Sequence, residues 1–417
     1  MPCFTSFNVL LPFPEYLPHW PVIACDQFTS QPEYWEEVER SVGGYPSALR
    51  CILPEAELAG CPEERYDSIR ASMRKYLQSG LFREYPDSFV YVERTLHDGQ
   101  IRSGVVGVVD LEQYDYHAHA RTAVRATEKT VEERIPPRMK IRRKAPLELS
   151  HVLLLCDDEG DRLISSLRDR RKRMEILYDM DLPMEGGHIT GWLADGEHAE
   201  AFKNELDLYC GRIKAGFSDE VNPDAAPVLF AVGDGNHSLA SARACYEELK
   251  KTGADCTALR LARYAMVELE NLWDDSQKIE PIHRILTGTD PHTALRFLKD
   301  TAGTDDPSEG IGIPWYSGKE NGTLYLRRER GLFPVGTLQN ALDTYCRGSG
   351  GTIDYIHDLD ALRSLAGQDG VIGFELPEIT AGTLFRGIAD GGVLPRKTFS
   401  MGTAREKRYY MEARRMT

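Results

Sequence analysis

The sequence predicts an α/β protein made of two domains, and three observations support this class. The apolar run Val228–Val232 leads into Gly233-Asp234-Gly235, after which apolar residues recur at helical spacing from Asn236 onward. Strand-like and helix-like segments alternate again after about residue 290. The chain has 417 residues, too many for one ordinary core. We place the boundary between residues 270 and 290, which gives domains 1–275 and 276–417.

The N-terminal region predicts a short strand that ends at a carboxylate. Pro21–Cys25 is apolar and is followed at once by Asp26. A helix is expected from about Pro32, because proline is tolerated in a first helical turn. A carboxylate at the end of a strand suits a catalytic acid or base. It is also a common turn residue, and both interpretations stay open.

A helix and a hairpin follow in the first domain. The helix is predicted over Glu63–Ser79, and the hairpin pairs Ser88–Leu96 with Ile101–Leu111 around an Asp-Gly turn. The pattern then predicts a strand at Ile189–Leu193, a helix at Glu197–Lys214 and a strand at Leu261–Glu270.

The second domain is expected to alternate helices and strands. Asn321-Gly322 predicts a hairpin turn. The predicted strands are residues 352–356 and 371–374, and the predicted helices are residues 293–301, 338–345, 358–365 and 380–389.

Two basic clusters interrupt an otherwise acidic chain. The stretch Arg125–Lys144 is rich in arginine and lysine but is broken by prolines, so it is either a loop that binds an anion or a solvated loop. The cluster Arg168–Arg173 lies in a segment with an apolar helical stripe. That cluster is most simply a solvated helix face.

The turn after Val232 predicts a cradle for an anion. A glycine turn that opens a helix presents unpaired backbone N–H groups and the positive end of the helix dipole. Asp234, Asn236, His237 and Ser238 crowd this turn, so several polar side chains can reach a bound phosphate or carboxylate. The alternative is an ordinary strand-to-helix connection with Asn236 as the N-cap.

Composition excludes several classes of function. The net charge of −15 argues against a general nucleic-acid binder, which needs a basic surface. No apolar run approaches the about 18 residues of a membrane span, and the N-terminal stretch does not resemble a signal peptide. Nine scattered cysteines without a C-x-x-C pair are typical of a reduced, cytoplasmic protein. We therefore expect a small-molecule substrate, with no nucleic-acid or membrane partner.

Several separated segments together resemble the prokaryotic family catalogued as domain of unknown function 1015. GDGNHSLA (Gly233–Ala240) stands where that family has an Asp-Gly-His-His-Arg turn. The other resembling segments are PVIACD (Pro21–Asp26), RATEKT (Arg125–Thr130), EPIHR (Glu280–Arg284), YIHDLDAL (Tyr355–Leu362) and LPRKTFSM (Leu394–Met401).

The resemblance implies a fold and an activity. The family is considered similar to the ParB and sulfiredoxin-like superfamily, which includes free-serine kinases, so we expect such a core with insertions plus a C-terminal α/β domain. It implies a phosphotransferase acting on the hydroxyl of a small metabolite, with free L-serine the first candidate. The donor would be ATP, ADP or pyrophosphate, with Mg²⁺ as the metal. A non-catalytic regulatory protein that binds a nucleotide or metabolite, or a phosphoserine-type phosphatase, remains the alternative. A sulfiredoxin-like reductase is disfavoured because the glycine turn has no cysteine.

By position, the resemblance makes Asp26 the candidate base toward the hydroxyl, with His237 and Asp234 as further catalytic candidates. Ser238 stands where the family has an arginine, which removes a bidentate phosphate contact. Another cation must then replace it, or the ligand differs. The candidate phosphate-binding residues are Gly233, Gly235, Asn236, Ser238, Glu128, Thr130, Arg134, His283, Arg284 and Lys397.

Overall fold

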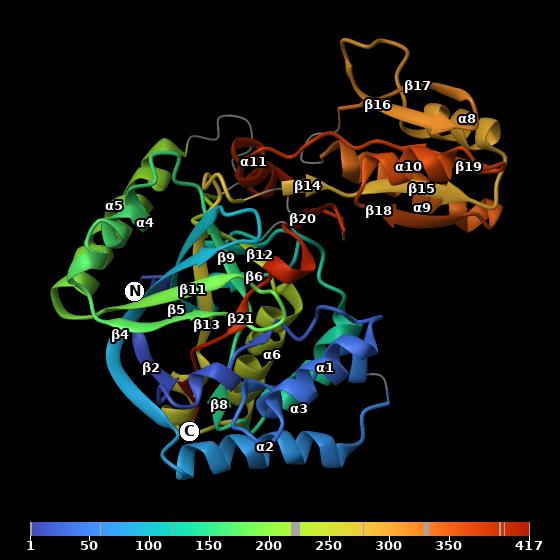
Figure 1. Ribbon diagram of the computed structural model, residues 1–417. Helices are drawn as coiled ribbons and strands as arrows, with labels where there is room; N and C mark the ends of the chain where they lie inside the picture. Colours follow the sequence, from blue (N-terminus) through green and yellow to red (C-terminus); the bar gives the residue numbers. More distant parts are fainter. Residues whose placement is uncertain are drawn as a thin grey trace.

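The computed structural model shows a large body that contains a long mixed sheet and a smaller α/β body beside it (Figure 1). The structure describes residues 2–58, 60–118, 120–217, 226–277, 279–328, 333–391, 393–395 and 397–416. The predicted α/β class is confirmed.

The large body is organised by an eleven-stranded sheet. Nine strands follow the order β10-β11-β4-β5-β13-β9-β12-β7-β6, while β1 pairs with β5 and β2 pairs with β4. Most neighbours are antiparallel, but β13 runs parallel to β9, and β7 runs parallel to both β12 and β6. The strands are β1 Phe4–Thr5, β2 Phe7–Pro12, β4 Phe82–Thr95, β5 Ile101–Asp110, β6 Tyr114–Asp115, β7 Val124–Ala126, β9 Leu153–Cys156, β10 Ile176–Asp181, β11 His188–Ala194, β12 Phe230–Asp234 and β13 Tyr264–Asn271.

Two apolar cores hold the helices of this body against the sheet. In one core, Phe202 of α5 packs edge-on against Phe89 of β4 with 4.9 Å between ring centroids. The other core contains the fully buried Trp20, which packs near Tyr76 of α2. The helices are α1 Pro32–Val42, α2 Glu63–Gln78, α3 Ile135–Arg142, α4 Arg162–Arg168, α5 Gly196–Gly216, α6 Asn236–Thr252 and α7 Cys256–Ala262.

The smaller body has a five-stranded sheet in the order β17-β16-β19-β15-β18. Its strands are β15 His283–Thr287, β16 Gly310–Ser317, β17 Glu320–Arg327, β18 Thr352–Ile356 and β19 Val371–Phe374. Its helices are α8 Pro291–Ala302, α9 Pro334–Ser349 and α10 Leu359–Ala366, and α11 Ala381–Gly391 packs nearby.

The predicted hairpin turn at Asn321-Gly322 is wrong by a few residues. Both residues lie in β17, paired with Tyr316 and Trp315, and the chain reverses at Gly318, whose φ is 59°. Gly322 is needed for another reason, because a Cβ there would come within 2.9 Å of the Trp315 ring. The glycine therefore makes room for an indole rather than forming a turn.

The chain after residue 398 returns to the large body. β20 Phe399–Met401 pairs with β14 Ile279–Pro281 at the junction of the two bodies. β21 Tyr409–Tyr410 then pairs with β3 Val22–Ile23, and β22 Arg414–Arg415 pairs with β8 Leu147–Glu148. The division into domains 1–275 and 276–417 stays a prediction, but this return places residues 409–415 beside the first of them.

A buried ionic cluster fastens this returning segment. The Arg408 guanidinium donates to Glu268 of β13 at 2.6 Å and to Glu412 at 2.7 Å. Tyr178 of β10 donates to the other oxygen of Glu412 at 2.5 Å. Glu412 is 0% exposed and Arg408 is 6% exposed, so solvent does not screen these contacts.

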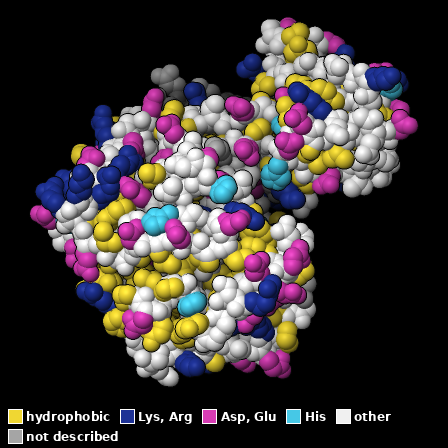
Figure 2. Space-filling model, in the orientation of Figure 1, with side chains coloured by type: hydrophobic (Ala, Val, Ile, Leu, Met, Phe, Trp, Pro, Cys, Tyr) yellow, Lys and Arg dark blue, Asp and Glu magenta, His cyan; other side chains and the backbone are white. Residues whose placement is uncertain are grey.

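Among the described residues, no helix is long and apolar enough to cross a membrane. Lys and Arg side chains gather on the surface over α4 and α5, the region of Arg168–Arg173 (Figure 2). No residue in the short helical turn Arg171–Arg173 is buried, which agrees with the predicted solvated face.

Candidate functional site

The predicted strand, turn and helix form at β12 and α6. β12 ends at Asp234, Gly235 takes a left-handed conformation with φ of 80°, and α6 begins at Asn236. Gly235 is therefore the N-cap, and the alternative that made Asn236 the N-cap is wrong. Leu239 is the first residue to donate back into the helix, to Gly235 O. The N–H groups of residues 236 to 238 thus precede the helical ladder.

Close packing explains both glycines of the turn. A Cβ at Gly235 would lie 2.9 Å from the Val152 side chain, and its positive φ disfavours other residues. Gly233 lies in the strand, where a Cβ would meet Leu155 and Met401 at 2.9 Å. Gly233 therefore supports packing behind the turn, while Gly235 and Asn236 face the cavity.

A polar cavity of about 220 Å³ opens at this turn. It brings together segments that lie far apart in the sequence, including the end of the first predicted strand, the basic stretch and the chain near residue 397. Its lining residues are Asp26, Glu55, Glu128, Lys129, Val131, Arg134, Arg138, Asp234, Gly235, Asn236, His237, Ser238 and Lys397. Nine of the thirteen candidate residues are among them.

A buried histidine, His151, contacts both Asp26 and the glycine turn. His151 Nε2 lies 3.8 Å from Asp26 Oδ2 and 3.3 Å from Ser238 Oγ. Its Nδ1 lies 2.7 Å from the Tyr410 hydroxyl, which also accepts the Cys25 N–H at 3.2 Å. The β3–β21 pairing thereby holds Asp26 against the first turn of α6.

His151 is charged at neutral pH. Burial by itself lowers its pKa, but the Asp26 carboxylate and the Cys25 thiol outweigh burial and raise the pKa to about 9. An imidazolium donates from both ring nitrogens, here to Tyr410 on one side and to Ser238 on the other. The Asp26 carboxylate therefore faces a cation at 3.8 Å.

This pKa predicts how stability changes with pH. The folded pKa of about 9 exceeds the ordinary 6.5, so stability from His151 is fully present below pH 6.5 and is lost as pH rises through 9. The free energy of unfolding of the wild type should fall over this window relative to that of His151→Gln. Urea unfolding across the window measures both. If the free energies of unfolding of the two proteins change in parallel with pH, His151 is neutral in the folded protein.

His237 lies in the same turn and has the opposite character. Burial lowers its pKa to about 4, and Arg138 and Arg134 add to the decrease. Its Nε2 accepts the Val131 N–H at 3.1 Å, so the neutral ring carries its proton on Nδ1. His237 can donate a hydrogen bond to a bound group, but it is not a proton donor at neutral pH.

Two arginines from the basic stretch border the cavity. Glu55 holds both of them, with Arg138 Nη2 at 2.9 Å and Arg134 Nη1 at 3.5 Å. Arg134 is half exposed, whereas the Arg138 side chain is only 14% exposed. The predicted loop is wrong for much of this stretch, because Ile135–Arg142 form α3 and Arg138 lies on that helix. Both arginines line the cavity at the N-terminus of α6, which favours anion binding over a merely solvated surface.

Two carboxylates, Glu128 and Asp234, line the cavity together with Lys397, and Lys407 pairs with one of them. Lys407 Nζ lies 3.1 Å from Asp234 Oδ2 and, together with His151, holds the pKa of Asp234 below its usual range despite burial. Glu128 accepts the Lys397 N–H at 3.2 Å and the Thr398 N–H at 2.9 Å. Burial raises the pKa of Glu128 to about 7 against those two donors, and Asp234 adds to the increase.

Besides Gly233, three predicted phosphate ligands lie outside the cavity lining. Thr130 is 7% exposed and lies behind the lining. His283 and Arg284 belong to β15 of the smaller sheet, where His283 Nδ1 accepts the Leu376 N–H at 3.1 Å and Arg284 Nε donates to Gln339 at 2.6 Å. Arg284 is 0% exposed. Hydrogen bonds within the smaller body therefore occupy both side chains, and neither lines the cavity, so their assignment to a phosphate site stays a prediction.

Sequence patterns missed four of the residues that shape the site. His151 precedes the apolar strand β9, and its apolar surroundings in sequence gave no sign of a charge. Glu55, Lys407 and Tyr410 reach the site only through contacts with distant segments. Arg138 lay within the noted basic stretch but was not singled out.

Fold and site together define an α/β protein whose glycine turn and helix N-terminus face a charged cavity. The chain belongs to the family described as "Protein of unknown function (DUF1015)", whose model matches residues 10–345. The predicted family is thereby confirmed. Among curated proteins, none matches the chain.

Several solved structures are similar over 71% of this chain. A free serine kinase variant in complex with ADP shows 12% identity and a TM-score of 0.37 over 87% of its own chain. SbnI with a C-terminal truncation, from Staphylococcus aureus, shows 9% identity and a TM-score of 0.35 over 82% of its chain. A conserved hypothetical protein from Pyrococcus furiosus shows 11% identity and a TM-score of 0.34 over 89% of its chain.

Proposed function

We propose that this protein is a phosphotransferase that acts on the hydroxyl of a small metabolite and holds the donor phosphates at the Gly233–Ser238 turn. One observation carries the proposal. A single cavity contains a helix N-terminus, the cations Arg134, Arg138 and Lys397, and the carboxylate of Asp26. Phosphoryl transfer needs mainly positioning, charge neutralisation and one base, and this set supplies each of them.

The phosphate end is assembled from the turn. Phosphoryl oxygens accept the N–H groups that precede the helical ladder of α6, and the Nδ1–H of His237 adds a neutral donor. Arg134 and Arg138 supply positive charge. This charge replaces that of the arginine that the family has at the position of Ser238. One polar atom of Asn236, Oδ1, is buried without a hydrogen-bond partner among the described residues. Buried polar atoms are normally satisfied, and this amide oxygen is an acceptor, so it would take a donor N–H or O–H or a cation of the ligand rather than a phosphate oxygen.

The acceptor end is Asp26. Its carboxylate takes the proton of the acceptor hydroxyl while that oxygen forms a bond to the transferred phosphorus. The bond from phosphorus to the bridging oxygen breaks, and its electron pair leaves with the remaining phosphate. His151 acts as a positioning residue, because its imidazolium holds the carboxylate near Ser238.

A magnesium ion fits the remaining carboxylates. Mg²⁺ is usually held by one or two carboxylates together with phosphate oxygens. Glu128 and Asp234 both line the cavity, and burial, with a smaller contribution from Asp234, raises the pKa of Glu128. These two residues would hold the ion, which neutralises phosphate charge when bound. The described residues contain no group of three or more His, Cys, Asp or Glu side chains that could hold a metal by themselves.

The test is a direct assay of transfer. Purified protein is incubated with L-serine, the acceptor that the family resemblance implies, and with ATP, ADP or pyrophosphate in the presence of Mg²⁺. We expect ³¹P NMR to show a phosphate monoester with one of these donors, and chelation of Mg²⁺ should abolish its formation. Donor binding without any monoester from serine or a panel of small alcohols would overturn the proposal in favour of a regulatory binder. Hydrolysis of phosphoserine without the forward reaction would favour a phosphatase.

A further inference from the structure

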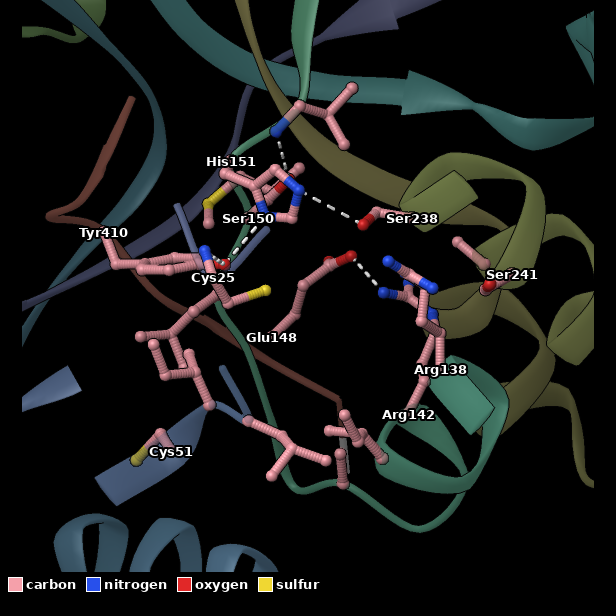
Figure 3. A pocket seen from close by; sticks show the side chains of 18 of the residues that line it. Cys25, Cys51, Arg138, Arg142, Glu148, Ser150, His151, Ser238, Ser241 and Tyr410 are labelled. Carbon is pink, nitrogen blue, oxygen red and sulfur yellow. Dashed lines mark hydrogen bonds and ion pairs between the residues drawn. The ribbon is translucent and has the colours of Figure 1, made fainter. Parts of the chain in front are cut away.

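A second cavity, of about 130 Å³, adjoins the polar one and is mostly apolar. Figure 3 shows its lining side chains in a ring that includes His151 and Ser238, with the Glu148 carboxylate pointing into the ring toward Arg142. Glu55, Arg138 and Ser238 line both cavities, so the two spaces share a wall. The apolar lining includes Leu53, Met73, Leu147, Val152, Leu239 and Met266.

The charged groups in this wall already have partners. Glu148 pairs with Arg142 and accepts from Arg414 Nε at 2.8 Å, and Glu148 is 5% exposed. Ser150 Oγ accepts the Val152 N–H at 3.1 Å. A molecule bound in this cavity would therefore contact mainly apolar side chains. An apolar cavity of similar size, about 150 Å³, is known to accept a benzene-sized molecule.

The shared wall places this cavity at the acceptor end. His151 and Cys25 line it, and His151 contacts Asp26, the residue proposed to take the hydroxyl proton. Ser238 lies in the first turn of α6, where the transferred phosphate would be bound. In a nucleotide, the ribose and the other phosphates separate the base from the transferred phosphoryl group. A nucleobase would therefore lie farther from Ser238 than this cavity does.

On the basis of the proposed function, we infer that the acceptor is an alcohol with a compact apolar body. The body occupies the apolar cavity, and the hydroxyl points past His151 and Ser238 to Asp26. The expected substrate class is a branched aliphatic or single-ring alcohol, larger and more apolar than serine. Each CH₂ group buried in such a pocket should raise kcat/KM about fourfold.

The experiment compares ethanol, 2-methylpropanol, benzyl alcohol and L-serine as acceptors in three proteins. Ala242→Leu, on α6, inserts a larger side chain into the apolar cavity. Ala244→Leu is the matched control, because it lies on the same helix but does not line this cavity. In the wild type and in Ala244→Leu, kcat/KM should be at least tenfold higher for 2-methylpropanol and benzyl alcohol than for ethanol. Ala242→Leu should lose that advantage.

Two further measurements do not depend on turnover or on one variant. Benzyl alcohol should bind the wild type and Ala244→Leu in a calorimetric titration, and at least tenfold more weakly to Ala242→Leu. If Ala242→Leu does not fold, Met73→Ala provides the reverse change by enlarging the cavity. It should shift the preference from 2-methylpropanol toward benzyl alcohol.

The outcomes separate this inference from the proposed function. Suppose that serine is phosphorylated, but that larger apolar alcohols give a lower kcat/KM to the same extent in all three proteins. The inference then fails, and the proposed phosphotransferase function remains. If Ala242→Leu raises the KM for the nucleotide rather than for the alcohol, the cavity holds the base and the inference also fails. If no alcohol is phosphorylated by the wild type with any donor, the proposed function fails together with the inference.

Discussion

Replacing Asp26 by asparagine should lower kcat for phosphoryl transfer about 10²- to 10⁴-fold, the range of general acid–base catalysis. Asparagine keeps the size of the side chain and one oxygen acceptor, but it cannot take the proton of the acceptor hydroxyl. In the proposed mechanism the donor phosphates bind at the Gly233–Ser238 turn and not at Asp26. The KM for the donor should therefore change little. Steady-state kinetics with the acceptor and the donor varied in turn measures both constants.

A matched control separates this loss from a general loss of charge. Asp305→Asn changes an aspartate whose side chain is 88% exposed and lies in the smaller body. That variant should retain wild-type kcat. If Asp26→Asn is folded by circular dichroism and is fully active, Asp26 is not the base. If it is unfolded, Asp26 is mainly structural.

The largest stability effect should follow from Arg408→Met. The substitution leaves the buried carboxylates of Glu268 and Glu412 without the guanidinium that now lies 2.6 to 2.7 Å from each. Breaking a buried ion pair by removing one partner typically costs about 3–5 kcal/mol. We expect the free energy of unfolding in urea to fall by about that amount.

Arg405→Met is the control for that variant. Arg405 lies three residues earlier in the same segment and pairs with Glu185, but its side chain is 54% exposed. Exposed ion pairs contribute about 0–1 kcal/mol, so this variant should unfold close to the wild type. Equal losses in the two variants would mean that the buried cluster does not hold the segment in place.

Local pattern predicted much of the fold. Apolar spacing and glycine placed β12, the turn and α6 within a few residues, because strand, turn and helix formation there depends on neighbours in sequence. The strands Thr352–Ile356 and Val371–Phe374 match the prediction for the same reason. The Asn321-Gly322 prediction failed because packing against Trp315, and not turn formation, requires that glycine.

The site was harder to predict from sequence, because distant segments complete it. His151 gains its charge from Asp26, which lies on the other side of α1, α2 and the long hairpin in the chain. Lys407 reaches Asp234 only after the chain has passed through the smaller body. His283 and Arg284 follow a rigid proline, but the neighbouring strands that bury them are not apparent in the local sequence.

The return of the chain at β21 also determines the order in which parts of the site can form during synthesis. Tyr410 supplies the hydroxyl that contacts His151 and Cys25, and Lys407 supplies the cation beside Asp234. Both residues are synthesised after the strands and helices that form the rest of the cavity. A growing chain can therefore build the sheet and the glycine turn before Tyr410 and Lys407 reach their partners there. We therefore expect the proposed activity to begin only after residue 410 has been translated and has paired with β3.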